Sequence, residues 1–444
     1  MLNLQTIASV LNIDLKEGED REISSVTIDT RQVQAGDLFV AMQGPNFDGH
    51  DFLTEAVAKG AAAILCKSSI EALSVPQLVV QDTLDALTQL ASYYRTTIDC
   101  PIIALTGSNG KTTVKEMIAS ILPKPAHATP GNLNNHIGVP LSVLQLKALH
   151  RYAVFELGAN HEGEIARTVS IVQPKVALIN NIAPAHIGEF GSIEAIVRAK
   201  GEIFQTLDAQ GTAVINADDR FANAWDNQLQ GKKVLRFSCH NPADVYAREV
   251  NFDGKGCASF KAVLPDGELG IRLKVPGKHM VLNALAAASC CFALGLPLEE
   301  IKQGLTSFQA VSGRMRVIDG KQKSIIIDDS YNANLNSVLS ALAVLAQFPG
   351  RRILVLGDMA ELGNWAQSHH REVGLMARKE GIDCLLTYGK MSEHASHAFG
   401  NNATHYTSQS ELAQNLLSQL NQETVVLVKG SRSAAMEKIV AQLI

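Results

Sequence analysis

The segment that most constrains the fold of this chain is the glycine-rich stretch LTGSNGKTT at residues 105–113. An apolar run at 101–104 precedes it and predicts a buried strand, and residues 114–122 carry apolar side chains at helical spacing. A phosphate-binding loop requires this order of strand, glycine-rich turn, Lys-Thr pair and helix, because backbone N–H groups and the helix N-terminus then face an anion. Lys111 would meet the β- and γ-phosphates, and the Thr112 hydroxyl can hold Mg²⁺. The segment therefore predicts ATP or GTP binding.

The loop departs from the common pattern in its length. That pattern places four residues between the first glycine and the Gly-Lys pair, whereas only Ser108 and Asn109 separate Gly107 from Gly110. This spacing indicates an unusual type of nucleotide-binding loop. The alternative is a glycine-rich turn that holds no nucleotide.

Composition narrows the class of protein. A chain of 444 residues suggests two or three domains, and its net charge of -5 gives no reason to expect nucleic acid or an anionic membrane as a partner. Seven cysteines without C-x-x-C spacing favour free thiols in a reducing cytoplasm, and no signal-peptide pattern is visible. Residues 280–298 are uncharged over a length that could span a bilayer, but Gly295 and Pro297 favour a buried helix. We expect a soluble, cytoplasmic protein without membrane insertion, and a monomer because no heptad pattern stands out.

Short strands and one helix alternate over the first part of the chain. The expected strands lie at 26–28, 38–41, 61–65 and 78–80. The loop 43–50 is rich in Gly, Pro, Asn and Asp, so it is a candidate ligand loop, although a plain surface turn fits it equally well. A helix over 83–98 leads into the phosphate loop, and the first domain boundary is placed at residue 83.

Strand–helix units then continue to the end of the chain. Expected strands lie at 153–155, 176–179, 212–215 and 234–237, which predicts a parallel sheet covered by helices, and residues 244–275 predict antiparallel hairpins. A second series has its strands at 324–327, 353–356, 384–386 and 425–428 and predicts a doubly wound, Rossmann-like domain. The expected fold is α/β in three domains: a small α/β domain at 1–83, a phosphate-loop domain with an antiparallel addition at 84–313, and the doubly wound domain at 314–444.

Glu156 ends an apolar strand, where an isolated buried carboxylate is costly unless it is paired or binds a cation. The functional interpretation is that Glu156, at a strand end that faces a phosphate loop, is a Mg²⁺ ligand. A solvated strand end is the structural alternative.

Lys200 lies among apolar residues of the helix that begins near Ser192, three or four positions from Ile196, Val197 and Ile203. Burial would lower the pKa of the amine, and a neutral lysine can take up CO₂ as a carbamate that binds metal. A lysine that extends to solvent at the rim of the helix is the simpler alternative.

His186 follows the strand at 176–179, as Glu156 follows its own strand. A lone loop histidine is usually unremarkable, but at the same sheet edge it could ligate a metal. Glu156, His186 and Lys200 together would suit a phosphoryl-transfer site with two cations.

These residues and five further stretches resemble the Mur ligases, the amide-forming enzymes of peptidoglycan precursor synthesis. The stretches are TPGNLNNH at 129–136, ELGAN at 156–160, DDSYNAN at 328–334, GDMAELG at 357–363 and KGSR at 429–432. The resemblance runs along the whole chain in family order. Three positions depart from the family pattern, namely His136, Met280 and Leu335, and none of them is a phosphate or metal ligand.

The resemblance implies a role for each matching position. ATP would be bound by Gly107, Ser108, Asn109, Gly110, Lys111, Thr112, Thr113, Asn283, Arg314, Asp329, Tyr331 and Asn332. Thr112 and Glu156 would hold one Mg²⁺, and Glu156, His186 and carbamylated Lys200 a second. The uridine nucleotide and the other substrate groups would be bound by Thr30, Arg31, Asn46, Asp48, His50, Asn134, Asn135, Asp358, Lys429 and Ser431. Lys111, Lys200, His186 and Arg314 are the catalytic candidates.

The implied reaction joins D-alanyl-D-alanine to UDP-N-acetylmuramoyl-tripeptide, with ATP activating the tripeptide carboxylate as an acyl phosphate that the dipeptide amine attacks. The third residue of the tripeptide, diaminopimelate or lysine, stays open. Another ligase of the superfamily, such as a folylpolyglutamate synthetase, and a nucleotide-binding protein without catalysis are the alternatives. A dinucleotide oxidoreductase is disfavoured because neither strand–helix series has a G-x-G-x-x-G pattern.

Overall fold

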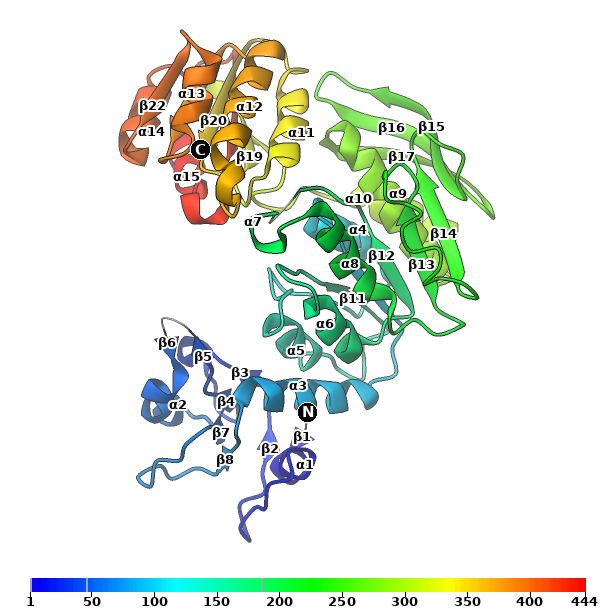
Figure 1. Ribbon diagram of the computed structural model, residues 1–444, viewed down its shortest axis with the longest axis vertical. Coiled ribbons are helices and arrows are strands. Elements are labelled where there is room, and N and C mark those ends of the chain that lie inside the picture. Colours follow the sequence, from blue (N-terminus) through cyan, green and yellow to red (C-terminus); the bar gives the residue numbers. More distant parts are fainter. Residues whose placement is uncertain (1, 45–46, 185–186) are drawn as a thin grey trace. The chain divides into compact units, whose positions relative to one another are not determined.

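Strands and helices alternate along most of the chain in the computed structural model, which describes residues 2–44, 47–184 and 187–444 (Figure 1). The chain divides into two compact units. The first comprises Met1–Ala104, Pro123–Ala159 and Gly163–Lys175, and the second comprises Leu105–Leu122, Asn160–Glu162 and Val176–Ile444.

The first unit begins with a four-stranded parallel sheet in the order β3-β4-β7-β8. Its strands are β3 (Val26–Thr27), β4 (Leu38–Val40), β7 (Ala63–Cys66) and β8 (Gln77–Val79). Helix α2 (Leu53–Ala58) packs on it through Leu53 and Ala56 beside Phe39 and Ile64. A hairpin of β5 (Gln43–Gly44) and β6 (Phe47–Asp48) carries the candidate ligand loop. The four strands expected here are confirmed.

The first unit also contains elements that lie later in the chain. These are α3 (Thr83–Thr96), α5 (Gly138–Val143), α6 (Glu164–Val172) and the parallel pair β10 (Ala126–Ala128) and β11 (Tyr152–Glu156). Helix α3 contacts both α5 and α6. The sequence pattern missed a first helix, α1 (Leu4–Val10), and a two-stranded pair of β1 (Leu2–Asn3) and β2 (Glu22–Ile23).

The second unit contains parallel strands followed by an antiparallel extension. The parallel strands are β12 (Val176–Ile179), β13 (Thr212–Asn216) and β14 (Lys233–Ser238), and the extension is β15 (Val245–Phe252), β16 (Cys257–Leu264) and β17 (Gly267–Pro276). Strand β14 pairs parallel with β15, and the hairpins β15–β16 and β16–β17 confirm the antiparallel addition. Helices α8 (Ile193–Gly201), α9 (Lys278–Ala293) and α10 (Leu298–Ser307) accompany these strands.

A six-stranded sheet, in the order β18-β19-β23-β20-β21-β22, forms the C-terminal part of the second unit. Its strands are β18 (Arg316–Asp319), β19 (Ile325–Asp329), β20 (Arg351–Gly357), β21 (Cys384–Tyr388), β22 (Ala403–Tyr406) and β23 (Thr424–Lys429). Leu412 and Leu416 of α14 (Gln409–Leu417) and Ile439 of α15 (Glu437–Leu443) pack against one face of this sheet. Helices α11 (Leu335–Leu345), α12 (Ala366–Lys379) and α13 (Glu393–Phe399) form a second helical layer (Figure 1). Helices on both sides confirm the doubly wound prediction.

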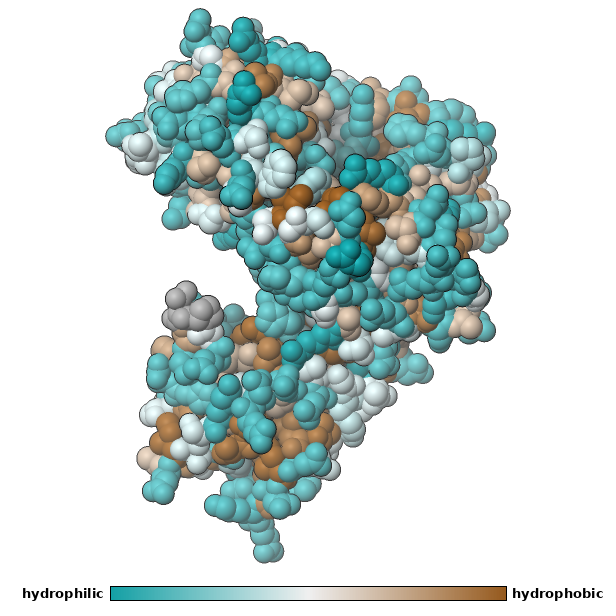
Figure 2. Space-filling view, viewed as in Figure 1, coloured by the Kyte–Doolittle hydropathy of each residue, from teal (hydrophilic) through white to brown (hydrophobic). Residues whose placement is uncertain are grey.

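Helix α9 occupies the apolar segment that raised the question of a membrane span. Most of its residues are buried, and it ends before Gly295, which has a φ of 81°. Within residues 2–44, 47–184 and 187–444, no helix combines the length and apolar character needed to cross a membrane. The face in Figure 2 is mainly hydrophilic, with apolar residues in small groups. All seven cysteines, which lie within the described residues, have free thiols in this structure.

Candidate active site

The glycine-rich segment forms a turn between β9 (Ile102–Thr106) and α4 (Lys111–Ile121). Gly110 has a φ of 77°, and a Cβ atom there would lie 2.8 Å from Asn283 Oδ1 and 2.9 Å from Asn180 Nδ2. Only glycine suits this left-handed and crowded position. Lys111 folds back over the turn and donates from Nζ to the Gly107 carbonyl at 2.7 Å. Thr112 and Thr113 occupy the first turn of α4, so the predicted phosphate ligands gather at one helix N-terminus, which suits an anion.

Two asparagines after β12 hold the turn in place, and the sequence analysis did not single them out. Asn181 Oδ1 accepts from the Asn109 N–H at 2.8 Å, and the Asn109 carbonyl accepts from Asn180 Nδ2 and Asn181 Nδ2, each at 3.0 Å. The Ser108 hydroxyl donates to the Ala183 carbonyl at 2.9 Å. Consecutive amide side chains at the end of a buried strand were the signal that could have identified them.

Strand β13 supports these asparagines from the other side. Asn216 Nδ2 donates to the Asn180 carbonyl at 3.0 Å, and Asp219 Oδ2 accepts from the Ile182 N–H at 2.6 Å. Asn283 of α9, the predicted adenine contact, is buried, and its Oδ1 accepts from Asn180 Nδ2 at 3.1 Å. In this structure Asn283 therefore packs behind the phosphate loop.

Lys200 is buried on the inner face of α8, with 4% of its surface exposed, so it does not extend to solvent. The pKa of its amine lies well below the ordinary value because burial disfavours the charged form, and the nearby positive charge of Lys111 adds to the effect. The interpretation of Lys200 as a rim lysine is therefore wrong. Burial of this kind favours the uncharged amine, which is the form that can take up CO₂.

Two side chains from the C-terminal part of the second unit reach the phosphate loop. Arg314 donates from Nη2 to Thr112 Oγ1 at 3.1 Å, and its guanidinium lies 4.1 Å from the centre of the Tyr331 ring. Asn334 Nδ2 donates to Asn109 Oδ1 at 2.7 Å. Arg314 and Asn334 thus bond to the loop, and Tyr331 lies against the Arg314 guanidinium.

Asp329 and Lys429 form a buried ion pair at the ends of the neighbouring parallel strands β19 and β23. Lys429 also donates to the Asn332 carbonyl at 2.9 Å, and Asp329 Oδ1 accepts from the Met315 N–H at 3.1 Å. These residues therefore hold the segment after β19 next to Arg314. Lys429, predicted to contact substrate, has only 3% of its side chain exposed.

Asp358 and Ser431, also predicted to contact substrate, meet at the ends of β20 and β23. The Asp358 carbonyl accepts from the Ser431 N–H at 2.9 Å and from its hydroxyl. The Asp358 carboxylate accepts through Oδ1 from the N–H groups of Met391, at 3.0 Å, and Ser392, at 2.7 Å, after β21. Asp358 therefore joins the ends of three strands at the carboxyl edge of the sheet, where ligands bind in such folds.

In the first unit, Glu156 at the end of β11 is buried, with 2% of its surface exposed. Its Oε1 accepts from Asn134 Nδ2 at 2.7 Å, while Oε2 is buried and has no hydrogen-bond partner among residues 2–44, 47–184 and 187–444. A buried carboxylate oxygen without a partner is costly, and a cation would satisfy it. Asn135, predicted to contact substrate, accepts through Oδ1 from the Gly138 N–H at 2.8 Å and so begins α5.

Four of the residues predicted to bind the uridine nucleotide lie in described parts of the first unit, and each bonds to another group of the protein. Arg31 pairs with Asp29 at 2.7 Å but has 84% of its side chain exposed. The Thr30 carbonyl accepts from Lys59 Nζ. Asp48 bonds to His50 Nδ1 at 2.6 Å, and His50 Nε2 accepts from the Lys67 N–H at 2.9 Å. Asn46 and His186 lie outside the described residues, and elsewhere in the chain no three His, Cys, Asp or Glu side chains form a metal-binding group.

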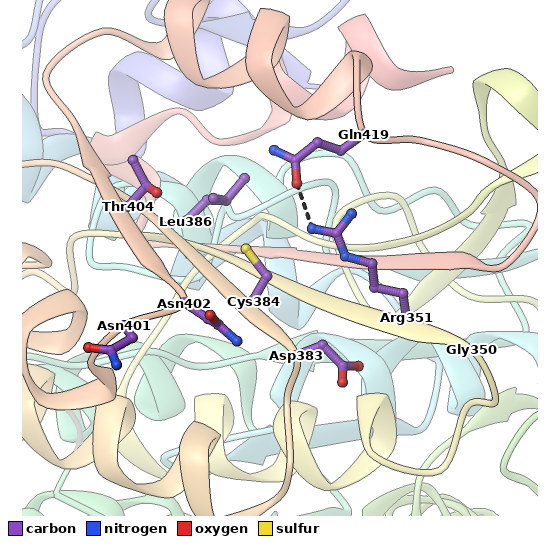
Figure 3. Close-up of a pocket in the computed structure, with 9 residues that line it drawn as sticks. All are labelled: Gly350, Arg351, Asp383, Cys384, Leu386, Asn401, Asn402, Thr404 and Gln419. Atoms are coloured by element: carbon purple, nitrogen blue, oxygen red, sulfur yellow. Dashed lines mark hydrogen bonds between the residues drawn. The ribbon is translucent and has the colours of Figure 1, made fainter.

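An open groove of about 630 Å³ lies at the opposite end of the C-terminal sheet (Figure 3). Arg351 and Cys384, which begin β20 and β21, line it, and Arg351 bonds to Gln419 at 2.6 Å. Asp358 follows the other end of β20. The groove therefore belongs to the amino edge of the sheet and takes no part in the candidate active site.

Three family models match successive parts of the chain. The model of the Mur ligase family catalytic domain matches residues 22–95, that of the Mur ligase middle domain residues 105–291, and that of the Mur ligase glutamate ligase domain residues 313–432. Together they cover most of the sequence and fall in family order.

Named relatives are similar over nearly the whole chain. UDP-N-acetylmuramoyl-tripeptide–D-alanyl-D-alanine ligase from Escherichia coli strain K12 is 43% identical over 447 aligned residues, covering 100% of this chain and 98% of its own. A crystal structure of MurF from Acinetobacter baumannii superposes with a TM-score of 0.91 at 36% identity, over 99% of this chain and 98% of that one. MurF from Thermotoga maritima, in complex with ADP, gives a TM-score of 0.83 at 27% identity, over 94% and 96%.

Proposed function

The chain belongs to the Mur ligase family, and we propose that it joins D-alanyl-D-alanine to UDP-N-acetylmuramoyl-tripeptide in an ATP-dependent step of peptidoglycan precursor synthesis. The observation that carries the proposal is the similarity, along the full chain, to ligases of that name. The phosphate loop and the arginine that reaches it supply groups for this chemistry.

In the proposed reaction a carboxylate oxygen of the tripeptide attacks the γ-phosphorus of ATP. The bond from that phosphorus to the bridging oxygen breaks, ADP leaves and an acyl phosphate forms. The amine of the dipeptide attacks the acyl carbon, and the tetrahedral intermediate loses phosphate and a proton to give the amide. Lys111 and Arg314 offset the negative charge on the transferred phosphoryl group. Exclusion of water by the C-terminal domain prevents hydrolysis of the acyl phosphate.

We propose that Thr112 and Glu156 hold one Mg²⁺ and that Glu156, His186 and carbamylated Lys200 hold a second. Support comes separately from each unit, from the unpartnered Oε2 of Glu156 in the first and from the Thr112 hydroxyl and buried Lys200 in the second. Oxygen donors of this kind suit Mg²⁺. When bound, Mg²⁺ would neutralise charge on the phosphates.

The carbamate proposal for Lys200 requires that its neutral amine attack CO₂, so that an N–C bond forms and a proton is released. Protein equilibrated with ¹³C-bicarbonate should show one carbamate carbon signal in its NMR spectrum, and Lys200→Ala should lack that signal. Lys200→Ala should also lose ligation, and added bicarbonate should not restore it. Near-normal turnover by this variant would refute the metal role of Lys200.

The remaining assignments concern the parts of the chain. We propose domains at 1–83, 84–313 and 314–444, with the uridine nucleotide bound in the first by Thr30, Arg31, Asn46, Asp48 and His50. The guanidinium of Arg31 supports this assignment because, although it pairs with Asp29, 84% of the side chain is exposed and open to a phosphate. We also propose that the protein acts as a cytoplasmic monomer, which cell fractionation and sedimentation equilibrium would test.

Phosphate release measured with single and paired substrates tests the proposed reaction. We expect release from ATP only when UDP-muramoyl-tripeptide and D-alanyl-D-alanine are both present. Tripeptides ending in diaminopimelate and in lysine should be compared, since the residues do not discriminate between them. Release with a different acceptor would indicate another ligase, and nucleotide binding without any release would indicate a non-catalytic protein.

A further inference from the structure

The peptide group between Asp358 and Met359 lies where the ends of β20, β21 and β23 meet. Its carbonyl, from Asp358, accepts from Ser431, and the Asp358 carboxylate accepts from two N–H groups after β21. The Oδ2 atom of Asp358 has no hydrogen bond within the described part of the chain, whereas Oδ1 accepts two. This peptide and the two N–H groups after β21 therefore together fix the position of Asp358.

The N–H of the same peptide is held by a histidine. His370 of α12 is 0% exposed, and its Nε2 accepts from the Met359 N–H at 2.9 Å. Its Nδ1 lies 2.7 Å from the Ala366 carbonyl, one helical turn earlier. A carbonyl only accepts, so Nδ1 carries the proton and Nε2 is the acceptor. A neutral imidazole, with one donor and one acceptor nitrogen, can therefore make both bonds.

We propose that His370 is a positioning residue for the dipeptide substrate, which as a neutral imidazole fixes the Asp358–Met359 peptide and through it the Asp358 carboxylate. This inference rests on the proposed function for the identity of the substrate. A buried N–H that loses its acceptor is costly, so without the imidazole the peptide would turn to find another partner. Asp358 would then leave its position at the sheet edge.

Protonation of His370 should have the same effect as its removal, because an N–H on Nε2 would then face the Met359 N–H. Burial lowers the pKa of His370, and the charged groups around it act in opposite directions. Asp358 raises the pKa, whereas His369 on the same helix and His394 on α13 lower it. The imidazole is therefore neutral at pH 7, and acid conditions should weaken dipeptide binding.

Three variants test the proposal. His370→Leu removes the acceptor and should raise the KM for D-alanyl-D-alanine by about tenfold or more, with the KM for ATP nearly unchanged. His370→Gln supplies an oxygen for the Met359 N–H and an N–H for the Ala366 carbonyl, so it should restore most of the affinity and lack the acid decline of kcat/KM for the dipeptide. His369→Gln, next in sequence and without a bond to this peptide, is the matched control.

Hydrogen exchange at residues 358–363, measured without substrates, separates this proposal from the proposed reaction. We expect faster exchange of the Met359 amide in His370→Leu than in the native protein, and native exchange in His370→Gln. Unchanged exchange and dipeptide KM in a folded His370→Leu variant would overturn the positioning role. An equal rise of the KM for ATP and the KM for the dipeptide would also overturn it. If the Leu variant does not fold, a decline of kcat/KM for the dipeptide at acid pH that persists in His370→Gln would overturn it. A native protein with no ligase activity would contradict the proposed reaction alone.

Discussion

The carboxylate of Glu156 is the side chain on which the metal proposal depends most. One of its oxygens is bonded to Asn134, and the other is buried without a partner in the part of the chain that the structure describes. A charge held this way reduces the stability of the ligand-free protein, and such strain is commonly found at functional sites.

Replacement of Glu156 by glutamine should separate the metal role from a structural one. The glutamine side chain would keep the bond from Asn134 and remove the buried charge, so the free energy of unfolding without ligands should be unchanged or higher. A tightly bound ligand stabilises a protein by about 2.7 kcal/mol at 100 times its dissociation constant. Glu156→Gln should lose most of the stabilisation that Mg²⁺ and ATP give the native protein in thermal unfolding. Equal stabilisation of both proteins would contradict the proposal.

Asn134 offers a matched comparison because it touches Glu156 but carries no charge. Asn134→Ala leaves the carboxylate in place but removes the group that orients it. Loss of such a supporting bond typically weakens a metal site about 10- to 100-fold. Titration of the variant with Mg²⁺ in the presence of ATP should show this weakening. An unaltered Mg²⁺ requirement would mean that Asn134 binds substrate or stabilises the fold and does not support a metal site.

Individual residues differed in how far the sequence could predict them. Lys200 could be placed on an apolar helix face because helical spacing is regular, although its burial required the structure. Asn180 and Asn181 stand out in the sequence only as consecutive amides after a buried strand. Their bonds to Asn109 required the structure, since hydrogen bonds between residues more than seventy positions apart leave no periodic signal.

At the scale of secondary structure, α10 meets α4, the helix after the phosphate loop, at a glycine. A Cβ atom on Gly304 would lie 2.5 Å from Ile121 Cα, which is backbone and cannot move aside easily. We expect Gly304→Ala to lower the free energy of unfolding by about 1–3 kcal/mol, as overpacking usually does. Urea unfolding would measure the change. Gln303→Ala, on the exposed face of the same helix, should change stability by less than about 0.5 kcal/mol, and a similar loss in both variants would contradict the steric explanation, since alanine favours the helix at either position.

Helix α12 also makes stability depend on pH. Burial lowers the pKa of His369 and His370 in the folded protein below the ordinary value of about 6.5. The unfolded chain therefore takes up these protons first as the pH falls, and stability is lost from about pH 6.5 downward to the folded pKa values. Urea unfolding at several pH values should show this decline, with a shallower slope in His370→Gln. An identical slope in that variant would show that other groups cause the decline.

The sequence predicted long elements well and short edge elements poorly. Buried parallel strands such as β12 and β23 appear as apolar runs, and the hairpins of β15 to β17 alternate with a period of two. The edge strands β18 and β22 are short and contain no buried residue, so they carry no such run. Helix α1 has seven residues, and only its cap, where Asn3 accepts from the Thr6 N–H, could have indicated it.

At the scale of the molecule, the predicted α/β fold in three domains is confirmed, because three family models match in order and the structure agrees with known ones over nearly the whole chain. The boundaries at residues 83 and 313 stay predictions. Turn residues mark where a strand ends but not which strands share a compact unit, since that depends on packing between distant segments.

Asn334 tests whether the C-terminal part of the second unit and the phosphate loop fold as one cooperative structure. Its Oδ1 caps α11 by accepting from the Ser337 N–H at 3.0 Å, and its Nδ2 donates to Asn109 Oδ1 at 2.7 Å. Asn334→Ser keeps a capping oxygen but removes the donor, whereas Asn334→Ala removes both and should cost about 1 kcal/mol more.

A double-mutant cycle of Asn334→Ser with Asn109→Ala isolates the bond between them. If the two parts unfold together, the cycle should give a coupling of about 0.5–1.5 kcal/mol in the free energy of unfolding. If each part unfolds separately, urea unfolding should show two transitions and a coupling near zero. A cycle of Asn334→Ser with Ser340→Ala, whose hydroxyl donates to the Asn336 carbonyl of its own helix, should give no coupling in either case. A single transition with measurable coupling would therefore mean that the bond from Asn334 links the stability of the phosphate loop to that of the sheet carrying Asp358 and Ser431.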